Sequence, residues 1–158
     1  MPSPERRLKL LTYPYLRYRY CNIKTLNLLP SVIASEYAER NGADEAVFLR
    51  GDTVTECAHS NISAIIDGIL YTHPTNELIL PGIAREALLS ECRRLGIARR
   101  EEAFTNEMLY SSDALLVTSS TRRCNLAESI DGRKMPSPTA EALLLCENLH
   151  KSFLKTTE

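Results

Sequence analysis

Two apolar segments flank Asp67-Gly68, and this arrangement constrains the fold more than any other feature of the sequence. Residues 61–66 (NISAII) and 69–72 (ILYT) have the composition of β-strands. An Asp-Gly pair between two such segments favours a type I′ turn, whose twist matches that of the strands it joins. The sequence therefore predicts an antiparallel β-hairpin here.

Other segments add to this hairpin and indicate a small sheet. Residues 45–49 (EAVFL) and 53–57 (TVTEC) are strand-like, and residues 8–23 favour extended structure with Pro14 as a break. Residues 114–120 (ALLVTSS) predict a buried strand that ends in small hydroxyl side chains. Asp131-Gly132 predicts a second tight turn.

Three segments carry the apolar spacing of amphipathic helices. The first starts near Asn27 and ends before Gly42, the second covers Gly82 to Leu95 before Gly96, and the third follows an N-cap at Ser137 and Pro138. Their apolar positions are Leu28, Leu29, Val32, Ile33 and Tyr37 in the first, Ile83, Ala87, Leu88, Cys92 and Leu95 in the second, and Leu143, Cys146, Leu149 and Phe153 in the third. Strands and helices alternate, so we expect a mixed α and β class.

Length and charge limit the possible functions. The 158 residues, 44% of them hydrophobic, fit a single domain with a real core. The net charge is -1 with both signs interleaved, which argues against a nucleic-acid partner. The sequence shows neither an apolar segment of about 20 residues nor the apolar core of a secretion signal, so we expect a cytoplasmic protein without membrane contact.

The cysteines and histidines do not form a recognisable metal pattern. Five widely spaced cysteines include no Cys-x-x-Cys pair, and the three histidines are scattered. We therefore expect reduced thiols and no metal site.

Some residues could carry chemistry on local grounds. Lys24 lies between Ile23 and Leu26, where partial desolvation would favour the neutral amine, although most such lysines reach solvent. Glu56 lies in a strand and could equally face water. Residues 81–84 (PGIA) at a helix start and residues 119–121 (SST) offer N–H groups and hydroxyls to an anion. Local sequence alone does not decide among these interpretations.

Four segments occur together in this order, IKTLNLLPSVIA, EAVFLRGDTVTECAHSNI, LYTHPTNELILPGIAREALLSECRRLGI and ALLVTSSTRRCNLAESIDG. Together they resemble the fold-type IV enzymes that use pyridoxal 5'-phosphate (PLP), a family that includes D-amino acid transaminases, branched-chain aminotransferases and aminodeoxychorismate lyases. The segment IKTLNLLPSVIA resembles that family's Schiff-base lysine segment, and EAVFLRGDTVTECAHSNI resembles its strand pair with a ring-facing glutamate. LYTHPTNELILPGIAREALLSECRRLGI and ALLVTSSTRRCNLAESIDG resemble its phosphate-binding segments. The resemblance implies the C-terminal large domain of the D-amino acid aminotransferase-like fold, a mixed sheet or pseudo-barrel flanked by helices.

The resemblance also implies roles for individual residues. Lys24 would hold PLP as a Schiff base and move the proton between substrate and cofactor. Glu56 would face the pyridine nitrogen, and the amides of Ile83 and Ala84 with the hydroxyl of Ser120 would bind phosphate. The remaining implied contacts are Thr121 near the substrate carboxylate and Ser60 near the cofactor.

Several positions depart from the family pattern. Ala84 replaces a threonine that would contact phosphate, which would remove a hydrogen bond worth about 1.5–3 kcal/mol. Residues 57–59 (CAH) replace a serine-rich run, and the pair Arg122-Arg123 introduces two cations that could alter substrate choice, although surface charges are the interpretation we favour. The family's N-terminal domain, which precedes the lysine segment, is absent from residues 1–158.

Two kinds of function follow. The first is transfer of an amino group between an amino acid, of the D-alanine or branched-chain type, and a 2-oxo acid, with aminodeoxychorismate lyase activity as an alternative on the same scaffold. Leu28-Leu29 after the lysine favours the D-amino acid pattern. The second is an inactive PLP domain kept for interaction or dimerisation. A further alternative is a soluble α and β domain in which Lys24 has only a structural role. In either case we expect a homodimer.

Overall fold

The computed structural model describes residues 6–15 and 18–154, except for the side chains of residues 153 and 154. The strands within these residues are β1 (Leu8–Pro14), β2 (Glu45–Arg50), β3 (Thr53–Cys57), β4 (Asn61–Ile66), β5 (Ile69–Thr72), β6 (Arg99–Arg100), β7 (Phe104–Thr105), β8 (Ala114–Ser119), β9 (Arg123–Ile130) and β10 (Arg133–Lys134). The helices are α1 (Leu29–Arg40), α2 (Ile83–Leu95), α3 (Asn106–Ser111) and α4 (Ala140–Leu154).

The strands form one mixed sheet. Its order is β6-β5-β4-β8-β9-β1-β2-β3-β7, and β10 pairs with β9 outside this path. β1 runs parallel to both β2 and β9, whereas β2–β3, β4–β5, β4–β8 and β8–β9 are antiparallel. The predicted mixed α and β class with a mixed sheet is confirmed.

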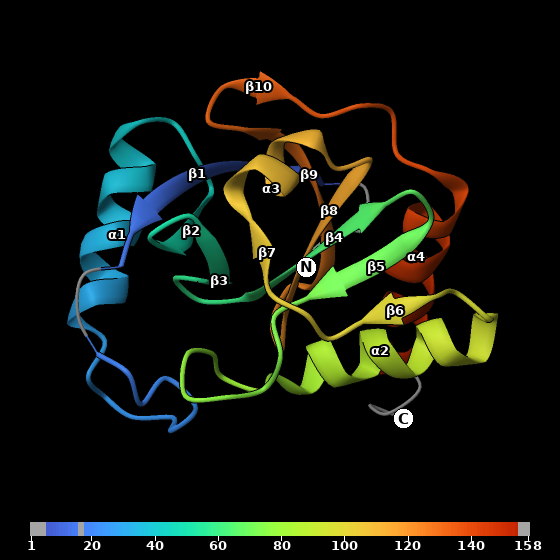
Figure 1. The fold of residues 1–158 in the computed structure, drawn as a ribbon, viewed down its shortest axis with the longest axis horizontal. Helices are drawn as coiled ribbons and strands as arrows, with labels where there is room; N and C mark the ends of the chain where they lie inside the picture. The colour runs from blue at the N-terminus through green and yellow to red at the C-terminus, as the bar shows by residue number, and fades with distance from the viewer. Residues whose placement is uncertain (1–5, 16–17, 155–158) are drawn as a thin grey trace.

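The sheet curls into a half-barrel (Figure 1). β3 and β4 stand far apart in the strand order, yet a short turn joins them and the Cys57 N–H donates to the Ser60 carbonyl at 2.8 Å. Because β3 and β4 must lie close together, the sheet between them bends around an apolar interior. The buried side chains of that interior include Leu8, Leu10, Val47, Val54, Ile62, Phe104, Leu109, Leu115, Val117 and Ile130.

Both predicted Asp-Gly turns are confirmed. Asp67 and Gly68 have φ angles of 49° and 75°, and β4 and β5 pair directly on either side of them. Asp131 and Gly132 have φ angles of 48° and 75° and connect β9 to β10. Two consecutive residues with positive φ are the geometry that a type I′ turn requires.

Helices α2 and α4 pack against the outer side of β8 and β9. Their shared core contains Leu88, Leu89, Cys92, Leu145, Cys146 and Leu149. Both helices are confirmed, but Ile83 is 77% exposed and Leu143 is 48% exposed, so neither is a core position. Thr139 rather than Ser137 caps α4, because its Oγ1 accepts the Ala142 N–H at 3.3 Å. Phe153 lies outside the described side chains.

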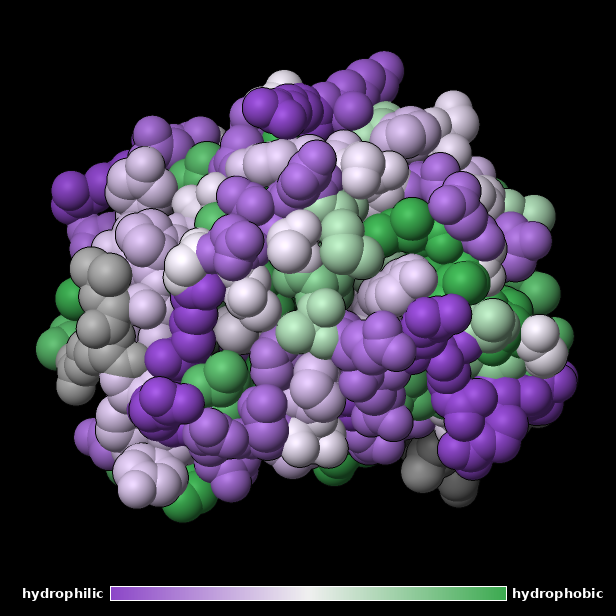
Figure 2. All heavy atoms as spheres, viewed as in Figure 1, coloured by the Kyte–Doolittle hydropathy of each residue, from purple (hydrophilic) through white to green (hydrophobic). Residues whose placement is uncertain are grey.

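Helix α1 is confirmed, but its buried face is the opposite of the one predicted. The side chains that pack on the sheet are Ala34 and Ala38, because only small residues let the helix approach β1 and β2 closely. The larger apolar side chains are not core positions. They are Leu28, Leu29, Val32, Ile33 and Tyr37, each between 46% and 59% exposed. Of these, Tyr37 still packs against Tyr13 of β1, with the ring centroids 5.2 Å apart. Figure 2 shows hydrophobic atoms at the edge where Figure 1 places α1, beside a largely hydrophilic face.

The extended segment predicted for residues 8–23 is shorter than expected. β1 ends at Pro14, which lacks an N–H for the sheet ladder, and residues 18–28 form turns and irregular structure. Residues 16 and 17 lie outside the described part of the chain. Among the described residues, none of the helices is long and apolar enough to span a membrane.

Candidate functional site

Glu56 of β3 points toward the segment that leads into α2. Its Oε2 accepts the Leu80 N–H at 2.8 Å. Burial raises the pKa of Glu56 from 4.5 to about 8, against smaller lowering effects of the Leu80 N–H and the Arg50 charge. A carboxyl group in this state holds its proton at neutral pH and would ionise beside a cation, such as a protonated ring nitrogen.

The N-terminus of α2 lies immediately after Leu80. Gly82 is the N-cap in extended conformation, and among the described residues no side chain caps this end. The first N–H groups of the helix, including those of Ile83 and Ala84, can therefore receive an anion. Ile83 is exposed and Ala84 is buried.

Asn61 fixes the approach of this helix end. Its amide donates to the Leu80 carbonyl at 2.8 Å. A Cβ at Gly82 would overlap Asn61 Oδ1, so any larger residue at this position would force the Asn61 side chain to shift. Together, Asn61 and Gly82 hold the helix start beside the Glu56 carboxyl group.

Arg85 supports the same segment from inside the protein. Its side chain is fully buried, and its guanidinium donates to the His73 carbonyl at 2.9 Å and to Glu101 at 2.9 Å. Burial also lowers the pKa of His73, which keeps that imidazole neutral beside the arginine. The segment between β5 and α2 is thereby anchored at both ends.

The segment that carries Lys24 lies against this same loop. The Cys21 N–H donates to the Glu77 carbonyl at 2.9 Å, and Arg19 forms an ion pair with Glu77 at 3.2 Å. A surface hollow of about 210 Å³ separates the two segments and is lined by Asn22, Thr75, Asn76 and Pro81. Lys24 is exposed, so the partial desolvation expected from its apolar neighbours does not occur here.

Arg50 and Tyr15 close the side of the site near Glu56. The Arg50 guanidinium lies 4.4 Å from the centre of the Tyr15 ring and also donates to the Tyr18 carbonyl. Burial, with a further contribution from Cys21, raises the pKa of Tyr15 to about 12. Tyr15 therefore stays protonated at any physiological pH.

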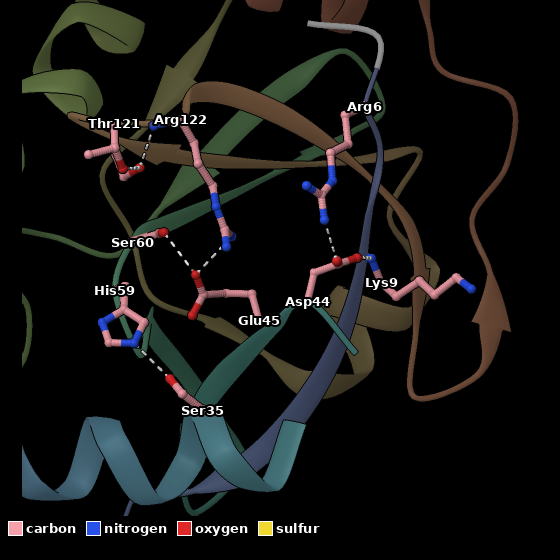
Figure 3. Close-up of polar contacts among 10 residues, drawn as sticks. Arg6, Lys9, Ser35, Asp44, Glu45, His59, Ser60, Thr121 and Arg122 are labelled. Atoms are coloured by element: carbon pink, nitrogen blue, oxygen red, sulfur yellow. Dashed lines mark hydrogen bonds and ion pairs between the residues drawn. The ribbon is translucent and has the colours of Figure 1, made fainter. Parts of the chain in front are cut away.

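The turns after β3 and β8 meet at Glu45, the first residue of β2 (Figure 3). Glu45 Oε2 lies 3.1 Å from Ser60 Oγ and 3.1 Å from an Arg122 guanidinium nitrogen. Arg122 is thus paired with a buried carboxylate, which corrects the expectation of a surface charge. Arg123 is half-buried and donates to the His150 carbonyl at 3.3 Å.

The hydroxyl residues of the turn after β8 are accessible. Ser120 and Thr121 are exposed, and Ser119 Oγ accepts the Arg122 N–H at 3.0 Å. In the turn after β3, Cys57 and Ala58 are buried whereas His59 reaches Ser35 of α1 at 2.7 Å. Burial raises the pKa of Cys57 well above its usual range, so its thiol remains protonated.

All the sequence-predicted residues except Lys24 thus fall into two groups; Lys24 is exposed and lies apart from both, on the segment that contacts the loop before α2. Glu56 lies beside the start of α2, and Ser60 is joined through Glu45 to the turn that carries Ser120 and Thr121. Sequence reasoning missed the residues that organise these groups, which are Glu45, Arg50, Asn61 and Arg85. Only two of them have a local signal in the sequence. Glu45 is an acid at the start of an otherwise apolar strand, and Asn61 is an asparagine at the start of another.

Comparison with known proteins bears on this arrangement. The family model for amino-transferase class IV matches residues 5–130. The chain belongs to this aminotransferase family. It is 41% identical over 131 residues to the D-alanine aminotransferase of Staphylococcus haemolyticus, an alignment that covers 83% of this chain and 46% of that enzyme. The chain therefore spans less than half the length of this class IV relative.

Solved structures of class IV proteins share the fold. A protein assigned as a 4-amino-4-deoxychorismate lyase from Legionella pneumophila superposes with a TM-score of 0.86 at 28% identity and covers 92% of this chain and 56% of its own. A branched-chain aminotransferase from T.th. with pyridoxamine 5'-phosphate superposes with a TM-score of 0.79 at 23% identity, covering 92% and 51%. The class IV family is PLP-dependent.

Proposed function

We propose that this chain is the lysine-bearing part of a class IV aminotransferase that transfers an amino group between D-alanine or a related amino acid and a 2-oxo acid, with PLP as cofactor. The observation that carries the proposal is the position of the Glu56 carboxyl group beside the uncapped start of α2. A ring-nitrogen partner and an anion site, next to each other, match the two polar ends of PLP.

The residues present fit PLP with one weakness. Glu56 would hold the ring nitrogen, the N–H groups of Ile83 and Ala84 with the Ser120 hydroxyl would bind the phosphate, and Ser60 would lie near the ring. PLP would supply an electron-accepting ring that stabilises negative charge at the substrate Cα. Ala84 offers no hydroxyl to the phosphate, which weakens this end of the site.

Lys24 has a distinct role in the proposal. Its amine would attach the cofactor and then carry a proton to and from the substrate Cα. Its exposure is consistent with a site that is open on this side, where the hollow between residues 22 and 81 lies. Thr121, on the turn after β8, would lie near the substrate carboxylate.

We further propose that a homodimer, or a segment beyond residues 1–158, completes the site. The exposed apolar side chains of α1 support this, since such a face is costly to leave in water. The alignment covers only 46% of the D-alanine aminotransferase, which is consistent with a site that residues 1–158 form only in part.

A lyase function is the alternative favoured by one specific observation, the Legionella pneumophila likeness. Both reactions would form pyruvate, from D-alanine plus a 2-oxo acid in one case and from aminodeoxychorismate in the other. We would incubate the PLP-loaded protein with each substrate and follow pyruvate, using Lys24→Ala as the control. The proposal expects Lys24-dependent pyruvate from D-alanine. Pyruvate from aminodeoxychorismate alone would favour the lyase, and none from either would favour an inactive interaction module.

A further inference from the structure

The Glu45 carboxylate is held in an unusual way. Its side chain is 1% exposed, and one oxygen, Oε2, serves both Ser60 and Arg122 at 3.1 Å (Figure 3). The other oxygen, Oε1, is buried without a hydrogen-bond partner among the described residues. Arg122 is the cation that pairs with this buried carboxylate among the described residues.

This contact joins parts of the chain that are far apart in sequence. Arg122 and Glu45 are 77 residues apart, and the Arg122 backbone also fastens its own turn to Ser119 Oγ at 3.0 Å. Ser60 belongs to the turn between β3 and β4, four residues after Glu56. Because both donors meet on one oxygen, the positions of the two turns depend on each other.

We propose that the Glu45–Arg122 ion pair is a positioning device that couples the turn at residues 58–60 to the turn at residues 119–122. This inference rests on the proposed function, in which the first turn lies near the cofactor ring and the second binds its phosphate. Fixing the separation of the two turns lets a single ligand bind both with no cost of ordering them. Glu45 and Arg122 act through their neighbours rather than on substrate.

A neighbouring ion pair provides a matched control. Arg6 pairs with Asp44 at 2.9 Å, one residue before Glu45 (Figure 3). The Arg6 side chain is 68% exposed, and the Asp44 carboxylate contacts Arg6, two residues before β1, and the Lys9 N–H within β1. Arg6→Gln therefore removes an Arg–carboxylate contact of similar length at the same end of β2 without touching either turn.

The first test uses the protein without PLP. Amide hydrogen exchange would be measured for the wild type, Arg122→Gln, Glu45→Gln and Arg6→Gln, with α4 as an internal reference. We expect Arg122→Gln to speed exchange at residues 58–61 and Glu45→Gln to speed it at residues 119–123, by about tenfold. Arg6→Gln should change neither. Unchanged exchange in the distant turn, or the same pattern in Arg6→Gln, would overturn the coupling.

The second test measures binding of PLP, of pyridoxal and of inorganic phosphate. If the two turns are coupled, Arg122→Gln should lower the affinity for PLP by about tenfold. It should lower the affinity for pyridoxal or for phosphate alone by less than about twofold. Arg122→Lys, which keeps a charge near Oε2, should restore much of the PLP affinity. Equal losses for all three ligands would show a merely structural role. Failure of the wild type to bind PLP would defeat the proposed function, while the exchange experiment would still decide the coupling.

Discussion

At the scale of single residues, the candidate site depends on groups whose protonation or size is set by their surroundings. Glu56 is the clearest case, because burial raises its pKa to about 8 while the unfolded chain titrates near 4.5. Gly82 is a second case, because its lack of a side chain allows the close contact with Asn61.

The raised pKa of Glu56 predicts a pH-dependent stability. Between pH 4.5 and 8 the unfolded chain releases the Glu56 proton and the folded chain keeps it, so the free energy of unfolding falls as pH rises. Below pH 4.5 both states hold the proton, so the slope disappears and the full stability is present; above pH 8 the loss is complete, at about 5 kcal/mol at most. Urea unfolding from pH 4 to 9 should show that Glu56→Gln removes this slope. Parallel pH profiles for the two proteins would contradict it.

The close contact between Gly82 and Asn61 predicts that substitutions at these two residues have non-additive effects on the free energy of unfolding. Gly82→Ala should cost about 1–3 kcal/mol, because the added Cβ overlaps Asn61 Oδ1 and the φ of -71° is itself acceptable for alanine. In an Asn61→Ala background the same change should cost clearly less. Denaturant unfolding of the four proteins gives the coupling energy, and additive effects would argue against the contact.

At the scale of elements, local chemistry predicted more than distant contacts did. The Asp-Gly turns and the Gly96 stop follow from backbone preferences of the residues themselves, and each is confirmed by positive φ angles. Apolar spacing correctly located α1, α2 and α4, but spacing alone does not say which side of a helix meets the sheet. In α1 the small residues Ala34 and Ala38 face inward, and close packing selected them over larger side chains.

In the candidate site too, local features were predictable from the sequence and distant contacts were not. Glu56 and the α2 start were recognisable because each lies within a contiguous segment. The Glu45–Arg122 pair was not, since Glu45 begins β2 and Arg122 lies in the turn between β8 and β9, and only the sheet order brings these elements together.

Helix α4 offers a test of its observed packing. Leu145 is fully buried in the core that α4 shares with the sheet, whereas the adjacent Leu144 is 41% exposed. Leu145→Ala should therefore cost about 2–5 kcal/mol of unfolding free energy, and Leu144→Ala should cost less than about 1 kcal/mol. Thermal or urea unfolding of both variants measures the difference. Similar losses for the two would mean that α4 packs with another face.

At the scale of the whole molecule, the half-barrel leaves one apolar face without a partner among the described residues. The exposed residues of α1, with Leu26 at 95% exposure, would be covered in a homodimer or by a further segment. If a second copy covers this face, Val32→Glu should shift a dimer to monomer with little loss of stability, because Val32 is 53% exposed. Light scattering at micromolar concentrations measures this, and a wild-type monomer throughout would contradict self-association.

We propose above all that Lys24 carries PLP. The measurement that tests it most directly is an absorbance spectrum after incubation with PLP and removal of the excess, for the wild type and Lys24→Ala in parallel. We expect a near-visible band in the wild type that is absent from Lys24→Ala, with borohydride reduction fixing the cofactor on the peptide that contains Lys24. A band of equal strength in both proteins, or no band in either, would contradict the claim.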